Sequence, residues 1–208
     1  MSQTIRNIVF DMGQVLIDFN PGVFIDRLGI AGEDKDLLLR EVFRSVEWMC
    51  LDRGSMDEEA AWTGMCARLP ARLHGAAREL VFSWWQRPLS PIPGTAELVG
   101  ELKAMGYGIY LLSNASRQVP RYFPRIPGSE YFDGEFVSAF YQLIKPQHAI
   151  YRKFCETFGL AAESCFFVDD QPVNIEAALG TGMRGAVFYG DIPRLRRDLN
   201  AAGVPVKL

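Results

Sequence analysis

The chain has 208 residues, of which 49% are hydrophobic and 23% are charged, and its formal net charge is -3. This composition is ordinary for a soluble globular protein, and the length suits one large domain or a core domain with a small accessory one. The small negative charge gives no support for nucleic acid or an acidic membrane surface as a partner, and no run is apolar and long enough to span a bilayer.

The cysteines indicate a reducing compartment. The four of them form no CxxC pair, and the first residues, "MSQTIRN", are polar and lack the apolar stretch of a secretion signal. We therefore expect reduced thiols and a cytoplasmic location. Composition assigns no oligomeric state.

The first half of the chain predicts one strand followed by helices. Ile5–Phe10 is a short apolar run without helical spacing, which is typical of a strand buried on both faces. Residues 30–89 are rich in Glu, Asp, Arg, Leu and Ala, and they predict several helices. The stretch "RPLSPIPG" holds three prolines and suits a stiff hinge.

Strands and helices alternate in the second half. A helix is expected over 95–106, and the later strands and helices follow in the order 107–114 (strand), 134–140 (strand), 146–159 (helix), 164–170 (strand), 172–182 (helix), 185–189 (strand) and 192–203 (helix). Strands separated by such helices imply a parallel sheet covered on both faces. The predicted fold is α/β, a doubly wound, Rossmann-like parallel sheet. Its core comprises 1–18 and 90–208, and an inserted α-helical cap comprises 19–89.

Polar side chains stand where the predicted strands end. Asp11 follows the first strand, Ser113 and Asn114 follow the second, and Asp169 and Asp170 follow a later one. Lys145 precedes Pro146 in the loop after the third strand. A single Asp after a strand is often a helix cap or turn residue. In open α/β sheets, however, ligands bind at the carboxyl ends of the strands, so we expect one shared site.

Phosphoryl transfer through an aspartyl intermediate fits this set of residues. A carboxylate can attack phosphorus, but two anions repel, so a divalent cation is needed. Mg²⁺ prefers oxygen ligands. Hydroxyl and amide groups can hydrogen-bond phosphate oxygens, and a lysine can neutralise the charge on both phosphate and carboxylate.

The chain resembles the haloacid dehalogenase-like hydrolase superfamily in four motifs that extend over nearly its whole length. They are "VFDMGQVL", "LLSN", "IKP" and "FFVDDQPVNIEAA". The helical insertion is similar to the superfamily's small α-helical cap. Within the superfamily, "LDRGSMDEEAAWTGM" and the Asp-x-Gly-x-Val pattern resemble the branch that contains alpha-D-glucose-1-phosphate phosphatase.

The resemblance implies a Mg²⁺-dependent hydrolase of small phosphorylated substrates, with sugar phosphates favoured. It makes Asp11 the nucleophile and Lys145 its catalytic partner, and it assigns phosphate binding to Ser113, Asn114 and Lys145. The implied metal ligands are Asp11, Asp170, Asp169 and the backbone carbonyl of Gly13.

Gly13 is a departure from the superfamily pattern. Most phosphatases of the superfamily carry a second Asp two residues after the nucleophile, where it protonates the leaving alcohol and later activates water. Glycine cannot do this, and such acid–base catalysis typically supplies about 10²–10⁴-fold. Asp18 is a possible substitute, although a loop Asp is more often a turn residue. A sugar 1-phosphate, whose leaving group departs easily, would need less help.

Two other functions remain open at this stage. Dehalogenases of the superfamily also lack the second Asp and need no metal, but they usually carry a tyrosine where Gly13 stands. A non-catalytic protein that binds phosphorylated ligands or a partner is the other alternative, and Gly13 is its only support.

Overall fold

The structure, a computed structural model, describes residues 4–207. Within this range the strands form one parallel sheet of five strands in the order β3-β2-β1-β4-β5. The strands are β1 (Asn7–Phe10), β2 (Gly108–Ser113), β3 (Gly134–Val137), β4 (Cys165–Asp169) and β5 (Arg184–Val187). The predicted α/β fold with a doubly wound parallel sheet is confirmed.

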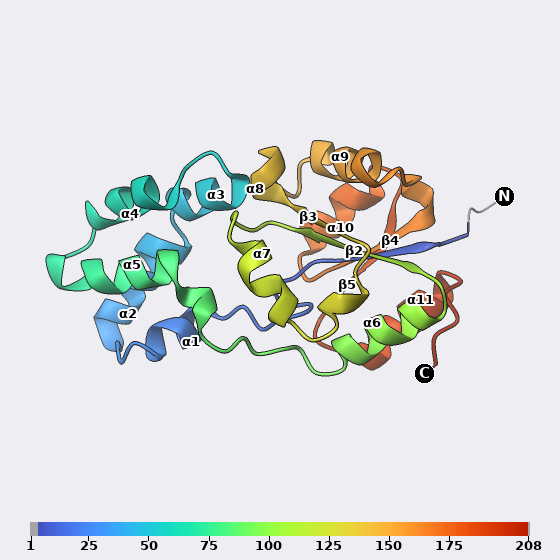
Figure 1. The fold of residues 1–208 in the computed structure, drawn as a ribbon, viewed down its shortest axis with the longest axis horizontal. Helices are drawn as coiled ribbons and strands as arrows, with labels where there is room; N and C mark the ends of the chain where they lie inside the picture. Colours follow the sequence, from blue (N-terminus) through green and yellow to red (C-terminus); the bar gives the residue numbers. More distant parts are fainter. Residues whose placement is uncertain (1–3, 208) are drawn as a thin grey trace.

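Helices cover both faces of this sheet, as Figure 1 shows. On one face lie α9 (His148–Phe158) and α10 (Pro172–Leu179), which pack Phe154 and Ile175 against the central strands. On the other lie α6 (Thr95–Ala104) and α11 (Ile192–Ala201). The shorter helix α7 (Val119–Tyr122) comes after β2 and a short loop, and α8 (Ser138–Tyr141) follows β3 directly.

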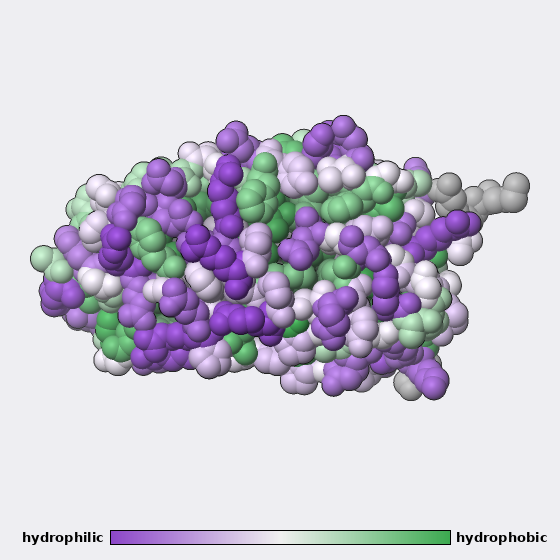
Figure 2. Space-filling model, in the orientation of Figure 1, coloured by the Kyte–Doolittle hydropathy of each residue, from purple (hydrophilic) through white to green (hydrophobic). Residues whose placement is uncertain are grey.

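The segment between β1 and β2 is helical, as predicted. It contains α1 (Pro21–Asp26), α2 (Gly32–Leu38), a π-helical turn (Leu39–Phe43), α3 (Val46–Arg53), α4 (Glu58–Cys66) and α5 (His74–Phe82). These helices form the left part of the molecule in Figure 1, beside the sheet. Hydrophilic and hydrophobic side chains are interspersed on the face drawn in Figure 2. None of the helices in 4–207 has the length and apolar character needed to cross a membrane.

Several predicted element boundaries differ from the structure by two or three residues, and two of them bear on the site. The strand expected over 134–140 ends at Val137, because the chain turns at the sheet edge and continues as α8. The buried Ser138 hydroxyl accepts a hydrogen bond from the Ala115 amide at 2.9 Å, which fixes this turn. The helix expected from Pro146 begins at His148.

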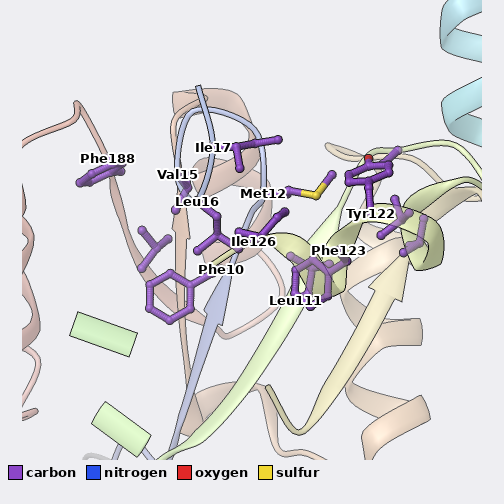
Figure 3. Packing of buried hydrophobic residues seen from close by; sticks show 14 of the residues in the cluster. Phe10, Met12, Val15, Leu16, Ile17, Leu111, Tyr122, Phe123, Ile126 and Phe188 are labelled. Carbon is purple, nitrogen blue, oxygen red and sulfur yellow. The ribbon is translucent and has the colours of Figure 1, made fainter. Parts of the chain in front are cut away.

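The loop after β1 is firmly attached to the rest of the core. Val15, Leu16 and Ile17 are buried, and Figure 3 shows them packed above Phe10. The Ile92 amide donates to Leu16 O at 2.9 Å, and Thr95 Oγ1 donates to Val15 O at 3.0 Å. This anchoring holds the residues that directly follow β1 at a fixed place on the sheet edge.

Candidate active site

The carboxyl ends of the central strands bring three acidic side chains together. Asp11 follows β1 directly, and its amide donates to Val168 O of β4 at 2.9 Å. Asp169 is the last residue of β4, and Asp170 follows it. One carboxylate oxygen from each of these aspartates lies within 4.8 Å of the others.

Lys145 reaches this cluster from the loop between α8 and α9. Its Nζ atom lies 2.9 Å from Asp11 Oδ1 and 2.6 Å from Asp169 Oδ2. It also donates to Leu112 O at 3.1 Å, so three acceptors surround the ammonium. The Lys145 side chain is only 1% exposed. The structure thus places the predicted lysine between the two predicted carboxylates.

Asn114 fixes the backbone of Lys145. Its Oδ1 accepts from the Lys145 amide at 2.8 Å, and its Nδ2 donates to Lys145 O at 3.0 Å. The sequence predicts Asn114 as a phosphate ligand, and it does line the pocket beside Ser113. The contacts of its side chain, however, are those of a clamp on the lysine loop.

Asp169 and Asp170 differ in how their oxygens are used. Asp169 accepts from the Gln171 amide at 2.8 Å, from Asn174 Nδ2 at 2.9 and 3.1 Å, and from Lys145 at 2.6 Å. Both of its oxygens therefore have donors, whereas Asp170 is partly buried and is bonded by the neighbouring Gln171 side chain. Of the two carboxylates, that of Asp170 is the more available to a metal ion.

Sequence reasoning missed Asn174. It is buried in the first turn of α10, and there it binds both oxygens of Asp169. Its position five residues after Asp169, on the helix that directly follows the strand, was the available signal.

The buried charges perturb one another's pKa values. Burial raises the pKa of Asp11 to about 6, although Lys145 opposes the shift. Burial also raises the pKa of Asp170. For Lys145, burial disfavours the charge, but Asp11 and Asp169 outweigh it and raise the pKa of the ammonium. Lys145 is therefore cationic at neutral pH, and the site contains more carboxylates than cations. Hard oxygen donors at this spacing fit Mg²⁺.

A pocket of about 100 Å³ opens over Asp11. Its polar lining includes Asp11, Asp52, Ser113, Asn114 and Ser116, and its apolar lining includes Met12, Ile17, Phe19, Trp48, Trp84 and Tyr122. The aromatic rings pack on one another, since the ring centroids of Trp84 lie 5.1 Å from Phe19 and 5.3 Å from Tyr122. Figure 3 shows Met12 extending from the loop after β1 toward Tyr122.

A comparison with known protein families agrees with this site and this fold. The sequence model of the haloacid dehalogenase-like hydrolases matches residues 5–182. The chain belongs to this family. It is therefore a hydrolase, and Asp11, the predicted nucleophile, directly follows β1.

The individual proteins that this hydrolase resembles share about a quarter of its residues. The sesquiterpene phosphatase astK of Aspergillus oryzae is 27% identical over 192 residues, covering 89% of this chain and 90% of that protein. A solved HAD-like family hydrolase from Porphyromonas gingivalis is 26% identical, with a TM-score of 0.70, and covers 95% of this chain and 98% of that one.

A third similar structure is the HAD family enzyme bt-2542 of Bacteroides thetaiotaomicron, which was solved in complex with magnesium and inorganic phosphate. It is 21% identical with a TM-score of 0.66, and the match covers 92% of this chain and 98% of that one. At this identity the likeness concerns the fold.

In this hydrolase, position 13 has room for a side chain. A Cβ atom on Gly13 would meet Phe19 Cβ at 3.6 Å, an ordinary contact, and its φ lies outside the left-handed region. Neither backbone conformation nor packing therefore requires glycine here. The absence of an acid at this position is a chemical feature of the site.

Two further aspartates, Asp18 and Asp52, differ in their position relative to the pocket. Asp18, the substitute considered from the sequence, accepts from Gln14 Nε2 at 3.2 Å and does not belong to the pocket lining described above. Asp52, near the end of α3, does line the pocket. Sequence reasoning did not single out Asp52. Trp48 packs on Phe43 with centroids 4.5 Å apart and lines the pocket as well.

Proposed function

We propose that this hydrolase is a Mg²⁺-dependent phosphatase that cleaves small phosphomonoesters through an aspartyl-phosphate on Asp11. One observation carries the proposal: the Asp11 carboxylate faces a pocket, pairs with Lys145 Nζ at 2.9 Å, and lies within 4.8 Å of an Asp170 oxygen. A nucleophilic carboxylate, a cation beside it and a second carboxylate for a metal are the groups that attack on a phosphoryl centre requires.

Each residue then has a defined task. Asp11 attacks phosphorus, and Lys145 neutralises the charge of the nucleophile and of the phosphoryl oxygens. The Ser113 hydroxyl hydrogen-bonds the phosphate, and Asn114 contributes both to phosphate binding and to the position of Lys145. Asp11, Asp170 and the Gly13 carbonyl would hold Mg²⁺, with Asp169 as an alternative ligand. The bound ion supplies positive charge that lets two anions approach.

Similar proteins support this proposal. The relative astK is named a phosphatase and aligns over 90% of its length. The bt-2542 enzyme was crystallised with the two species, magnesium and phosphate, that the proposed reaction needs. A 2-haloacid dehalogenase is the alternative within the family. It is disfavoured by Gly13, where these dehalogenases usually carry a tyrosine, and by the pair Asp169 and Asp170, whose carboxylates suit a metal ion.

Sugar phosphates, and sugar 1-phosphates in particular, are the substrates we favour. The anomeric hydroxyl leaves more easily than an ordinary alcohol, which suits a site without an acid at position 13. A second candidate, the phosphate of an apolar alcohol, is favoured by the wall of Phe19, Trp48, Trp84 and Tyr122 and by the name of astK. Aromatic faces can pack on either kind of leaving group.

The proposal also divides the chain into a catalytic core and a cap. Residues 1–18 and 90–208 form the catalytic core, and 19–89 form a cap whose helices supply part of the pocket wall. A small phosphorylated molecule is the partner, and a cytoplasmic location fits the reduced cysteines.

Phosphate release from a panel of substrates tests the function. The panel contains glucose 1-phosphate, glucose 6-phosphate, farnesyl phosphate and p-nitrophenyl phosphate, each assayed with Mg²⁺ and with EDTA. Mg²⁺-dependent release supports the phosphatase, and the ranking of the first three separates sugar from apolar substrates. No release from any of them, together with chloride release from 2-chloropropionate in EDTA, would replace it with a dehalogenase. No reaction in either assay would favour a binding protein.

A further inference from the structure

The pocket contains a carboxyl group for which the reaction described so far has no use. Among the residues that line it, Asp11 and Asp52 carry carboxyl groups. Asp52 comes from α3 of the helical segment, whereas Asp11 follows β1 of the sheet. The acidic group that can share a metal within residues 4–207 consists of Asp11, Asp169 and Asp170, so Asp52 is not one of its members.

We propose that Asp52 is the general acid–base residue of this enzyme and replaces the side chain that Gly13 lacks. The inference rests on the proposed phosphatase function. It supplies from the cap a group that most phosphatases of the family carry in the loop after the first strand.

The backbone of Asp52 is fixed to the catalytic core. Ser138 Oγ donates to Asp52 O, and the same hydroxyl accepts from the Ala115 amide at 2.9 Å. Ala115 follows the proposed phosphate-binding residues Ser113 and Asn114. A single buried hydroxyl thus joins the end of α3 to the loop after β2, so Asp52 has a defined position relative to the phosphate site.

The end of α3 also approaches the core unusually closely. Gly54 follows the helix with φ 76°, and a Cβ atom at this position would lie 2.0 Å from Ala139 O of α8. Only glycine permits this approach and this backbone conformation. The end of α3, which carries Asp52, therefore packs directly against the backbone of α8 in the core.

The environment of the Asp52 carboxyl favours its protonated form. Burial raises the pKa of Asp52 well above its ordinary value, the charge of Asp11 raises it further, and a hydrogen bond from the Trp48 side chain opposes the shift. The structure gives Asp52 no ion pair with a Lys or Arg among residues 4–207. Tyr122, another titratable group that interacts with Asp52, is kept neutral because burial raises the pKa of its phenol.

A protonated carboxyl in this place can complete both half-reactions. In the first, an Asp11 oxygen forms a bond to phosphorus, the bond from phosphorus to the ester oxygen breaks, and Asp52 gives its proton to that oxygen. In the second, the Asp52 carboxylate takes a proton from water while the water oxygen attacks phosphorus. The bond from phosphorus to Asp11 breaks, phosphate leaves, and Asp52 is protonated again.

Leaving-group dependence tests this role. Asp52→Asn removes the proton and retains the shape, so we expect the rate with glucose 6-phosphate, an ordinary alcohol ester, to fall by about 10²–10⁴-fold. Formation of the phosphoenzyme from p-nitrophenyl phosphate, whose leaving group needs no proton, should change little, and a burst of p-nitrophenolate should precede a slow steady state. Asp18→Asn, the same chemical change outside the pocket lining, is the matched control and should retain the wild-type rate.

Mass spectrometry gives a second readout. Because water activation also fails, a phosphoryl group should accumulate on Asp11 in Asp52→Asn but not in wild type or Asp18→Asn. Asp52→Ser should accumulate the same phosphoenzyme, and it can be used in place of Asp52→Asn if Asp52→Asn fails to fold. An unchanged rate with glucose 6-phosphate and no accumulation would overturn the role of Asp52 alone. A wild-type protein that releases no phosphate from any ester would overturn the proposed function and this role with it.

Discussion

Lys145 Nζ lies 2.6 Å from Asp169 Oδ2, and both side chains are buried. Asp169 is bonded on the other side by Gln171 and Asn174. It therefore acts as a support that holds the lysine in place for Asp11. A buried charge pair contributes little by itself, but removing one partner leaves the other charge uncompensated.

The main effect of Asp169→Asn should consequently be a loss of stability. The new amide nitrogen would face either Lys145 or Asn174, so a donor would meet a donor. We expect the free energy of unfolding in urea to fall by about 3–5 kcal/mol. Asp170→Asn is the matched control, and its free energy of unfolding should change by less than about 1 kcal/mol. Equal losses in the two variants would contradict the distinction between them.

Asp11→Asn should abolish turnover without unfolding the protein. The amide has nearly the same shape, and it relieves the burial of a carboxylate whose pKa burial already raises to about 6. Phosphate release and the far-ultraviolet circular dichroism spectrum measure the two properties. A variant that retains its rate would rule out Asp11 as the nucleophile.

Asp170→Ala should weaken magnesium dependence and activity together. Loss of an outer-shell partner already costs about 10–100-fold in metal affinity, so loss of a direct ligand should raise the half-saturating Mg²⁺ concentration by at least as much. Initial rates across a magnesium titration give this value. An unchanged titration curve would remove Asp170 from the metal site.

Much of the fold and the site is readable from the sequence. The apolar run before Asp11 and the alternation after Gly106 predict a parallel sheet, and the rule that ligands bind at the carboxyl ends of the strands brings Asp11, Lys145 and Asp169 together. The structure has this arrangement because parallel strands end at one edge.

Other features depend on contacts that sequence spacing does not reveal. Asp52 is 41 residues from Asp11 in the chain. It reaches the pocket through the close packing of Gly54 on Ala139 and the hydrogen bond from Ser138. The division of labour between Asp169 and Asp170 likewise depends on Asn174, whose side chain bonds only Asp169 of the two.

The effect of Mg²⁺ on stability should depend on pH. In the metal-free protein the pKa of Asp11 is about 6, compared with an ordinary value of 3.8. Between these two pH values the native state therefore holds a proton on Asp11 that the unfolded state has released. The contribution of Asp11 to stability is therefore full below pH 3.8 and is lost as the pH rises through about 6. The pKa of Asp170 is raised as well and acts in the same direction.

Metal binding needs the ionised carboxylates and has the opposite pH dependence. At pH 5 only about one-tenth of Asp11 is ionised, so Mg²⁺ should bind about tenfold more weakly than above pH 7. The rise in Tm produced by a fixed Mg²⁺ concentration should consequently be larger at pH 7.5 than at pH 5. Scanning calorimetry at the two pH values measures it, with Asp11→Asn as the control that should lose the difference. An equal rise at both values would contradict the role of Asp11 as a ligand.

Gly13→Asp should rescue Asp52→Asn. A Cβ atom at position 13 meets only Phe19 Cβ, at 3.6 Å, so neither the backbone nor the packing at Cβ opposes a side chain here. In the family pattern an Asp at this position is the acid–base group. The double variant should therefore hydrolyse glucose 6-phosphate at least about tenfold faster than Asp52→Asn, within the 10²–10⁴-fold that acid–base catalysis supplies. Gly13→Asn in the same background is the matched control, because it adds the bulk without the acid and should give no rescue. Equal rates for the Asp and Asn double variants would mean that a proton donor is not what Asp52→Asn has lost.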